Sequence, residues 1–192
     1  AINVTGTETS TVKGTVVATP LALNINGTGE DALMLEDAAV LTVASTNVNS
    51  GDLGIGAATL NTGNVVIKSG ASVWTDGAAT INGNTPATDT FKAVAGSFLA
   101  LDGGNLAINN FKTVSLDGGI YLDGAAGVPY NITIGNGDVT IGSNAVLSMG
   151  AELAAALTPD AALTANNLFL DASTADSLTV ADSFLDVRIA YG

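Results

Sequence analysis

Four aspartates at or beside glycine turns are the residues of this sequence best suited to bind a metal ion: Asp102, Asp117, Asp123 and Asp138. A carboxylate together with loop carbonyls supplies the oxygen ligands that Ca²⁺ prefers. Asp before Gly is also a turn signal without any metal. The sequence contains neither the G-G-x-G-x-D repeat nor the D-x-[DN]-x-[DN]-G loop of calcium proteins. Calcium is therefore the one cofactor that the sequence leaves open, with plain turns as the alternative.

The sequence offers few residues for catalysis. It contains no His and no Cys, which excludes an imidazole base, a thiolate nucleophile and zinc sites built on either ligand. Glycoside hydrolysis needs two acids held together. The four glutamates do not fall on consecutive strands of a repeat: Glu8, Glu30, Glu36 and Glu152. We therefore predict that the chain is not an enzyme.

Two aromatic residues, Trp74 and Tyr121, have the chemistry to stack on a sugar ring. Single aromatic side chains on a β-rich surface also pack against their neighbours without any ligand. The sequence does not decide between these roles, so a surface glycan or a receptor stays open as a partner.

The overall composition limits the class of protein. Apolar residues make up 47% of the 192 positions and charged residues only 12%, which excludes a disordered chain. The formal net charge is −13 with five Lys and Arg residues, so we expect neither a nucleic acid nor an anionic lipid surface as a partner. No run of apolar residues reaches the roughly 18 that a membrane-spanning helix needs.

A short repeated motif predicts the strands and turns that position these side chains. In this motif, Gly is followed by Asn or Asp, then Val or Leu, then any residue, and then Ile. Gly with Asn or Asp favours a turn, and apolar residues two apart face one side of a strand. The motif occurs at Gly51–Ile55, Gly63–Ile67, Gly104–Ile108 and Gly137–Ile141, at intervals of 12, 41 and 33 residues. It therefore indicates an irregular repeat.

The motif also predicts a shared core. Six of its apolar residues should be buried: Val65, Ile67, Leu106, Ile108, Val139 and Ile141. Two of the copies match over a longer stretch, with Leu60–Val73 corresponding to Ile134–Leu147. One segment differs from the rest, because residues 151–165 contain strong helix formers and predict a short helical patch.

Units of this form, rich in Thr, Asn, Ala and Gly, resemble the β-solenoid passenger domains of autotransporters and filamentous-haemagglutinin-type adhesins over about Val48 to Met149. The resemblance implies a parallel β-helix-like fold, a secreted or cell-surface location, and a structural or adhesive role. A β-sandwich or jelly roll would show many of the same turn signals. We therefore expect a single all-β domain over residues 1–192, an irregular β-solenoid, with the sandwich as the alternative.

Polysaccharide lyases built on β-helices are similar to this expected fold and use a basic residue beside acidic calcium ligands. That role would fall to Lys68, Lys112 or Arg188 next to a group of aspartates. Solvated charges on an acidic surface are the simpler interpretation, so a polysaccharide-acting enzyme ranks last among the functions considered.

The two ends of the chain, residues 1–19 and 185–192, are strand-prone and carry little charge. The most regular apolar alternation in the sequence is formed by Leu185, Val187, Ile189 and Tyr191. Unpaired strand edges with little charge favour pairing with another chain. We therefore predict a structural protein that polymerises by strand pairing, as a subunit of a filament, sheath or surface layer. The alternative is an adhesin or a phage-fibre-like binding module.

Overall fold

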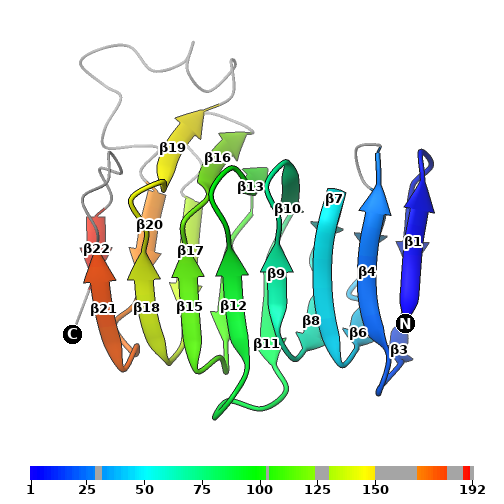
Figure 1. The fold of residues 1–192 in the computed structure, drawn as a ribbon, viewed down its shortest axis with the longest axis horizontal. Coiled ribbons are helices and arrows are strands. Elements are labelled where there is room, and N and C mark those ends of the chain that lie inside the picture. Colours follow the sequence, from blue (N-terminus) through cyan, green and yellow to red (C-terminus); the bar gives the residue numbers. More distant parts are fainter. Residues whose placement is uncertain (29–31, 103, 124–129, 150–167, 181–187, 191–192) are drawn as a thin grey trace.

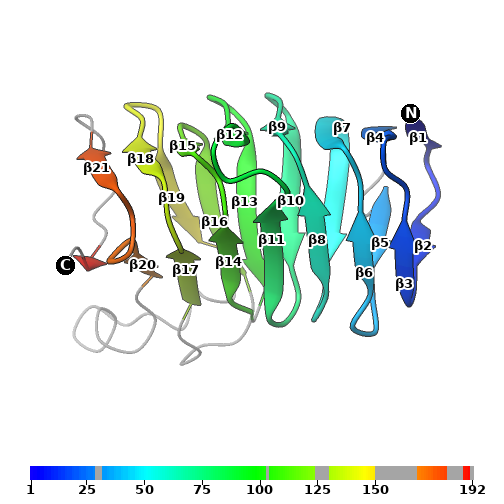
Figure 2. The ribbon, with the colours of Figure 1, turned by 90° about the horizontal axis from the view of Figure 1, so that it is seen from below.

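The computed structural model describes residues 1–28, 32–102, 104–123, 130–149, 168–180 and 188–190. These residues form a parallel β-solenoid whose chain winds through three sheets (Figures 1 and 2). Every strand pair runs parallel, for example β1 with β4 and β10 with β13, so the β-sandwich alternative is wrong. The described residues contain no helix, and the helical patch expected near 151–165 lies outside them.

Each turn of the solenoid contributes one strand to each sheet, except the last described turn, for which no strand of sheet B is described. Sheet A consists of β1 (Ile2–Gly6), β4 (Ala22–Gly27), the first part of β7 (Ser45–Ile55), β9 (Val65–Ile67), β12 (Thr90–Ala93), β15 (Thr113–Leu116), β18 (Asp138–Ile141) and β21 (Ser177–Val180). Sheet B consists of β2 (Ser10–Val12), β5 (Leu33–Leu35), the second part of β7, β10 (Ala71–Thr75), β13 (Phe98–Asp102), β16 (Gly119–Asp123) and β19 (Val146–Met149). Sheet C consists of β3 (Thr15–Val17), β6 (Val40–Thr42), β8 (Thr59–Thr62), β11 (Ala79–Gly83), β14 (Leu106–Asn109), β17 (Tyr130–Ile134), β20 (Leu168–Asp171) and β22 (Arg188–Ala190).

Strand β7 turns the corner between sheets A and B without a break. Its pairing with β4 ends at Ser50, and its pairing with β10 begins at Gly51. Gly51 has a φ of +69°, a conformation that glycine adopts at little cost. The first copy of the sequence motif therefore begins at a corner of the solenoid.

The position of each motif copy explains the irregular intervals. The copy at Gly51 enters sheet B, those at Gly63 and Gly137 enter sheet A, and that at Gly104 enters sheet C. The motif thus marks a corner followed by a strand in any sheet. The Gly63 and Gly137 copies match over a longer stretch because β9 and β18 lie three turns apart in the same sheet, with β12 and β15 between them.

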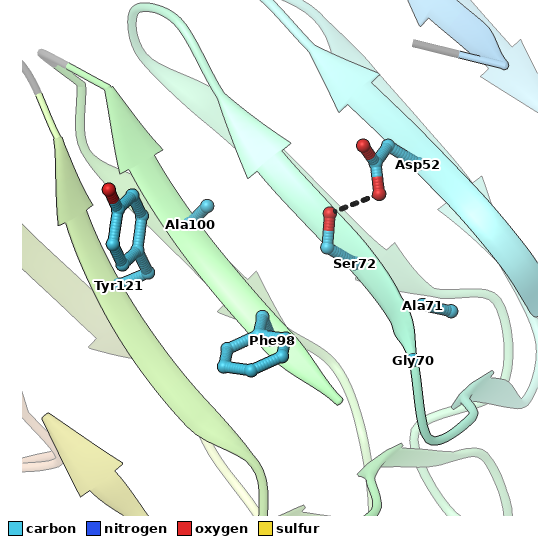
Figure 3. Close-up of a pocket in the computed structure, with 7 residues that line it drawn as sticks. All are labelled: Asp52, Gly70, Ala71, Ser72, Phe98, Ala100 and Tyr121. Carbon is cyan, nitrogen blue, oxygen red and sulfur yellow. Dashed lines mark hydrogen bonds between the residues drawn. The ribbon is translucent and has the colours of Figure 1, made fainter. Parts of the chain in front are cut away.

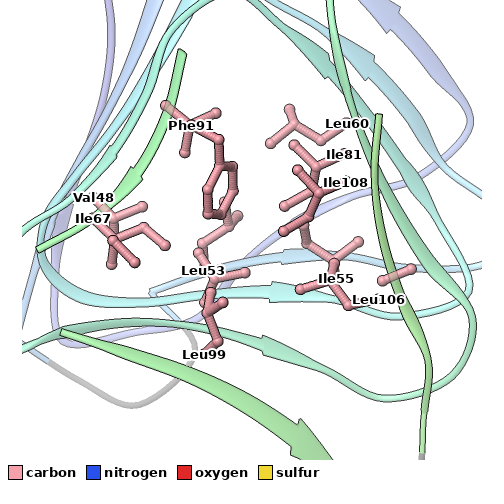
Figure 4. Close-up of a cluster of buried hydrophobic side chains, with 14 of the residues drawn as sticks. Val48, Leu53, Ile55, Leu60, Ile67, Ile81, Phe91, Leu99, Leu106 and Ile108 are labelled. Atoms are coloured by element: carbon pink, nitrogen blue, oxygen red, sulfur yellow. The ribbon is translucent and has the colours of Figure 1, made fainter. Parts of the chain in front are cut away.

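A continuous apolar core fills the interior of the solenoid (Figure 4). The burial of all six motif residues is confirmed, since none is more than 1% exposed: Val65, Ile67, Leu106, Ile108, Val139 and Ile141. Phe91 and Phe111 are the largest of the fully buried side chains, and their rings meet edge to face with centroids 5.8 Å apart. The alternation predicted from the sequence therefore places the core correctly.

Asparagine side chains form hydrogen-bonded columns on the outer faces of sheets A and C. In sheet A, Asn47 donates to Asn24 at 2.9 Å and Asn24 donates to Asn3 at 3.0 Å. In sheet C, Asn82 donates to Asn61 at 3.1 Å. Such amide ladders form where like residues stack in register along a sheet. They join successive turns by side-chain bonds in addition to the backbone ladder.

An exposed ion pair joins the first two turns. Lys13, which lies between β2 and β3, places its Nζ 2.7 Å from Asp37 Oδ2 and 3.1 Å from Glu36 Oε2. The hydrogen bonds to Asp37 and then Glu36 raise the pKa of Lys13 above 10.5. A raised lysine pKa means that the contact is present at neutral pH and is lost as the pH rises through the raised value.

We expect the methyl NMR signals of Val12 and Val16, on β2 and β3, to shift with a midpoint above pH 10.5 as this contact breaks. Replacing Lys13 by Met should abolish that titration, because no charge remains to be lost. A wild-type midpoint at or below 10.5 would contradict the assignment of the ion pair.

Candidate functional site

Aromatic side chains gather on the outer face of sheet B. Along the strands of this sheet, buried residues alternate with outward ones, as the pleat requires. The buried set includes Leu53, Val73, Leu99 and Ile120. The positions before or after them, which face outward, include Asp52, Ser72, Phe98 and Tyr121.

A shallow groove of about 460 Å³ lies on this face (Figure 3). Its lining comes from β7, β10, β13, β16 and the turn before β10: Asp52, Gly70, Ala71, Ser72, Phe98, Ala100 and Tyr121. Because neighbouring strands of the solenoid supply these residues, the groove crosses the strands and runs along the solenoid axis. A cavity of this size is in the range of small-ligand sites, which span about 300–1,000 Å³.

Strand register brings the lining residues together. Asp52 is paired with Ser72, and Ser72 with Phe98, on three successive strands. Tyr121 lies one strand further, paired with Ala100. The small Ala100 lies two residues from Phe98 on β13 and beside Tyr121 on β16, and Figure 3 shows both rings on this face of the sheet.

Two side chains at one end of the groove are joined by a short hydrogen bond. Ser72 Oγ donates to Asp52 Oδ1 at 2.6 Å, and both residues are half-buried. No Lys or Arg is among the lining residues. The polar end of the groove therefore combines a hydroxyl and a carboxylate, and no cation is among its described lining residues.

The ring of Phe98 packs against the next strand, β16, because residue 119 there is a glycine and leaves room for it. A Cβ atom at Gly119 would lie 2.7 Å from Cδ1 of Phe98, closer than such contacts allow. The ring therefore lies over Gly119, yet 39% of Phe98 is still exposed. This glycine seats the aromatic ring at the edge of the groove.

Trp74 belongs to the same face but not to the groove. A Cβ atom at Gly54 would lie 2.9 Å from Nε1 of Trp74 and would also meet Sδ of Met34. Trp74 and Met34 thus pack over Gly54 and cover it. Of the two aromatic residues singled out for sugar stacking, Tyr121 lines the groove and Trp74 does not.

The four aspartates considered as calcium ligands lie in different places. Asp102 and Asp123 hold paired positions at the ends of β13 and β16, whereas Asp117 follows β15 and Asp138 begins β18 in sheet A. Asn144 donates to Asp117 through its backbone N–H at 3.0 Å and through its side chain, and Ser177 donates to Asp138. Among the described residues, no three acidic, His or Cys side chains are grouped as a metal site would need. Calcium at these turns stays a prediction.

The residues proposed for assembly are only partly described. Ile189 lies in β22, where it is paired with Leu170 of β20. Leu185, Val187 and Tyr191 lie outside the described residues. At the other end, the strand-prone segment 1–19 does form strands, namely β1, β2 and β3.

Sequence reasoning did not single out Asp52, Ser72 or Phe98 as parts of one site. Their outward orientation follows from the alternation along each strand. Whether they lie side by side on adjacent strands depends on how many residues each turn of the solenoid contains. Between paired positions the chain advances 20 residues from Asp52 to Ser72 and 26 from Ser72 to Phe98. No local pattern in the sequence specifies these two lengths.

Comparison with models of protein families, with curated proteins and with solved structures finds no match. The β-solenoid agrees with the fold that the resemblance to autotransporter passenger domains and haemagglutinin-type adhesins implies. The comparisons add no relative in either group. The part of the chain that the structure describes has no helix with the length and apolar character needed to cross a bilayer.

Proposed function

We propose that the protein is a non-enzymatic extracellular structural subunit that assembles end to end into a filament, sheath or surface layer. The observation that carries this proposal is the partial burial of the first described turn, at one end of the solenoid. The inward side chains of that turn pack against the core but are only partly buried: Ile2, Val4, Val12 and Ala18. On the next turn, Leu23 is 1% and Ile25 is 0% exposed. A further turn of strands would cover this end, as neighbouring repeats do in solenoids.

The backbone of the first turn supports the same conclusion. In the described chain, β1, β2 and β3 each pair on one side only, with β4, β5 and β6. The N–H of Ser10 donates to Ala32 O at 3.2 Å and that of Ala18 donates to Thr42 O at 2.8 Å. Because alternate residues of a parallel strand bond to opposite neighbours, the N–H groups of Thr11 and Val17 point away from the solenoid.

Little on this edge opposes pairing with another chain. Val17 is 68% exposed, and the only charged residues among positions 1–20 are Glu8 and Lys13. Strand edges that avoid association normally carry charges, Pro or bulges. The opposite end offers strands β19, β21 and β22, each the last of its ladder in the described chain. Contact between unlike ends is heterologous, so it generates a filament unless the rotation between subunits closes a ring.

The test replaces Thr11 and Val17 together by Pro. Proline removes the two outward N–H donors and leaves the bonds of Ser10 and Ala18 in place. We expect the wild-type protein to form regular polymers in electron microscopy, and the double variant to lose about tenfold or more of the polymer in sedimentation. Circular dichroism should show the same β signal for both proteins.

The matched control exchanges the two side chains, as Thr11→Val with Val17→Thr, which keeps both N–H donors and should still polymerise. The proposal fails if the wild-type protein stays monomeric at high concentration, or if the proline variant forms the same polymers. Monodisperse rods or trimers that bind a ligand would instead favour the adhesin.

A further inference from the structure

The groove on sheet B combines aromatic rings with hydrogen-bonding groups. We propose that it binds a neutral polysaccharide chain, whose hexose rings stack on Phe98 and Tyr121 and whose hydroxyls bond to Asp52 and Ser72. The apolar C–H face of a hexose packs on an aromatic ring, while its hydroxyls need partners such as a carboxylate or a serine. Both kinds of partner line this groove.

The distribution of aromatic residues supports this role. Five aromatic side chains are described: Phe91 and Phe111 are buried in the core, and Trp74, Phe98 and Tyr121 face outward on sheet B. The outer faces of sheets A and C carry asparagine columns instead along the strands whose side chains are described. Apolar surface gathered on one face of a protein commonly marks a binding site.

The charge of the site selects a neutral ligand. Asp52 contributes a carboxylate, no Lys or Arg lines the groove, and the chain carries a net charge of −13. A uronate, sulfate or phosphate group would be repelled by this field and would find no cationic partner. A ligand with uncharged hydroxyls can instead donate to the Asp52 carboxylate and to Ser72 Oγ.

The length of the groove selects a chain rather than a small ion. Asp52 lies on β7 and Tyr121 on β16, with β10 and β13 between them. Strands in a sheet are about 4.8 Å apart, so these two residues are separated by roughly 14 Å along the axis. A single ammonium group cannot contact both, as it would in an aromatic cage. An extended oligosaccharide can contact all of the lining side chains.

The experiment measures binding of the full chain to four neutral hexasaccharides by isothermal titration calorimetry: the β-1,4-linked oligomers of glucose, mannose, galactose and N-acetylglucosamine. We expect at least one to bind. Phe98→Ala and Tyr121→Ala should each weaken that binding about tenfold, because each removes one stacking surface. Asp52→Asn keeps an oxygen that accepts from Ser72 but replaces the carboxylate by a weaker, neutral acceptor, so it should also weaken the binding, by less than either aromatic variant.

The control variant is Val66→Ala, which shortens a half-buried apolar side chain on β9 of sheet A. It should bind like the wild-type protein, and melting curves should show that all four variants are folded. Hexagalacturonate, the acidic probe, should not bind. Choline, the cationic probe, should bind neither the wild-type protein nor Asp52→Asn.

Three outcomes would overturn the proposal. The first is that none of the four neutral hexasaccharides binds. The second is that choline or hexagalacturonate binds in their place. The third is that Phe98→Ala abolishes self-association without changing glycan binding, which would make this face a contact between copies. The groove shares no residue with the edge of the first turn, so the glycan experiment and the proline experiment can fail separately.

Discussion

Replacing Phe91 by Ala is expected to lower the free energy of unfolding by about 3–5 kcal/mol. Phe91 lies on β12, is 0% exposed and packs edge to face on Phe111, with an interplanar angle of 71°. The expected loss has two parts, the transfer of the ring from the core to water and the cavity left between rigid sheets. Figure 4 shows the ring among aliphatic side chains such as Leu60 and Ile81, which belong to sheet C on earlier turns.

Urea denaturation followed by circular dichroism measures this loss. The neighbouring Lys92→Ala is the matched control, because Lys92 is exposed on the same strand and should change stability by less than about 0.5 kcal/mol. Phe91→Leu should cost less than Phe91→Ala because it fills part of the cavity. A loss below about 1 kcal/mol for Phe91→Ala would contradict the packing described for the core.

The orientation of each strand could be predicted from the sequence because it depends on local alternation. Ile67 and Ile141 are two residues from Val65 and Val139, so each pair must face one side of its strand. The apolar side then has to be the interior in any fold that buries it. This reasoning holds equally for a solenoid and for a sandwich, so it predicts the core residues without deciding the architecture.

The stacking of strands could not be predicted in the same way. Whether Ser72 lies beside Asp52 or beside another residue depends on the number of residues in a turn, and that number ranges from 19 to 26 between Thr46 and Val139 in sheet A. Parallel pairing between distant strands is decided by the whole turn, including its corners. The groove of sheet B is assembled by this register, so no single segment of the sequence contains it.

The aspartates illustrate a second limit on what the sequence can predict, namely the hydrogen-bond partners of a side chain. Asp117 lies beside a glycine turn, as a calcium ligand would, but its Oδ1 accepts the backbone N–H of Asn144 at 3.0 Å. The carboxylate thus bonds to a loop of the next turn, and the sequence shows the two residues 27 positions apart. A glycine turn signal in the sequence predicts that an aspartate lies at a tight turn. It does not predict which turn of the solenoid donates a hydrogen bond to the carboxylate.

Replacing Gly137 by Ala is expected to lower the free energy of unfolding by about 2–5 kcal/mol, the sum of backbone strain and overpacking. Gly137 begins the last motif copy and has a φ of +92°, which L-residues with a side chain rarely adopt. An added Cβ would also meet the carbonyl oxygen of Phe111 and lie 2.9 Å from the carbonyl carbon of Lys112. Both contacts are with backbone, which cannot rotate away as a flexible side chain can.

Gly70→Ala separates the two causes. Gly70 has a similar φ of +78°, but nothing lies within 4 Å of an added Cβ, so this variant should show the strain alone, about 1–2 kcal/mol. The difference between the two variants then measures how closely the corner at Gly137 stacks on the preceding turn, where Asp138 N–H donates to Lys112 O at 2.8 Å. Equal losses from the two variants would show that the motif glycine serves only the bend of the corner, and that the turns do not pack against each other there.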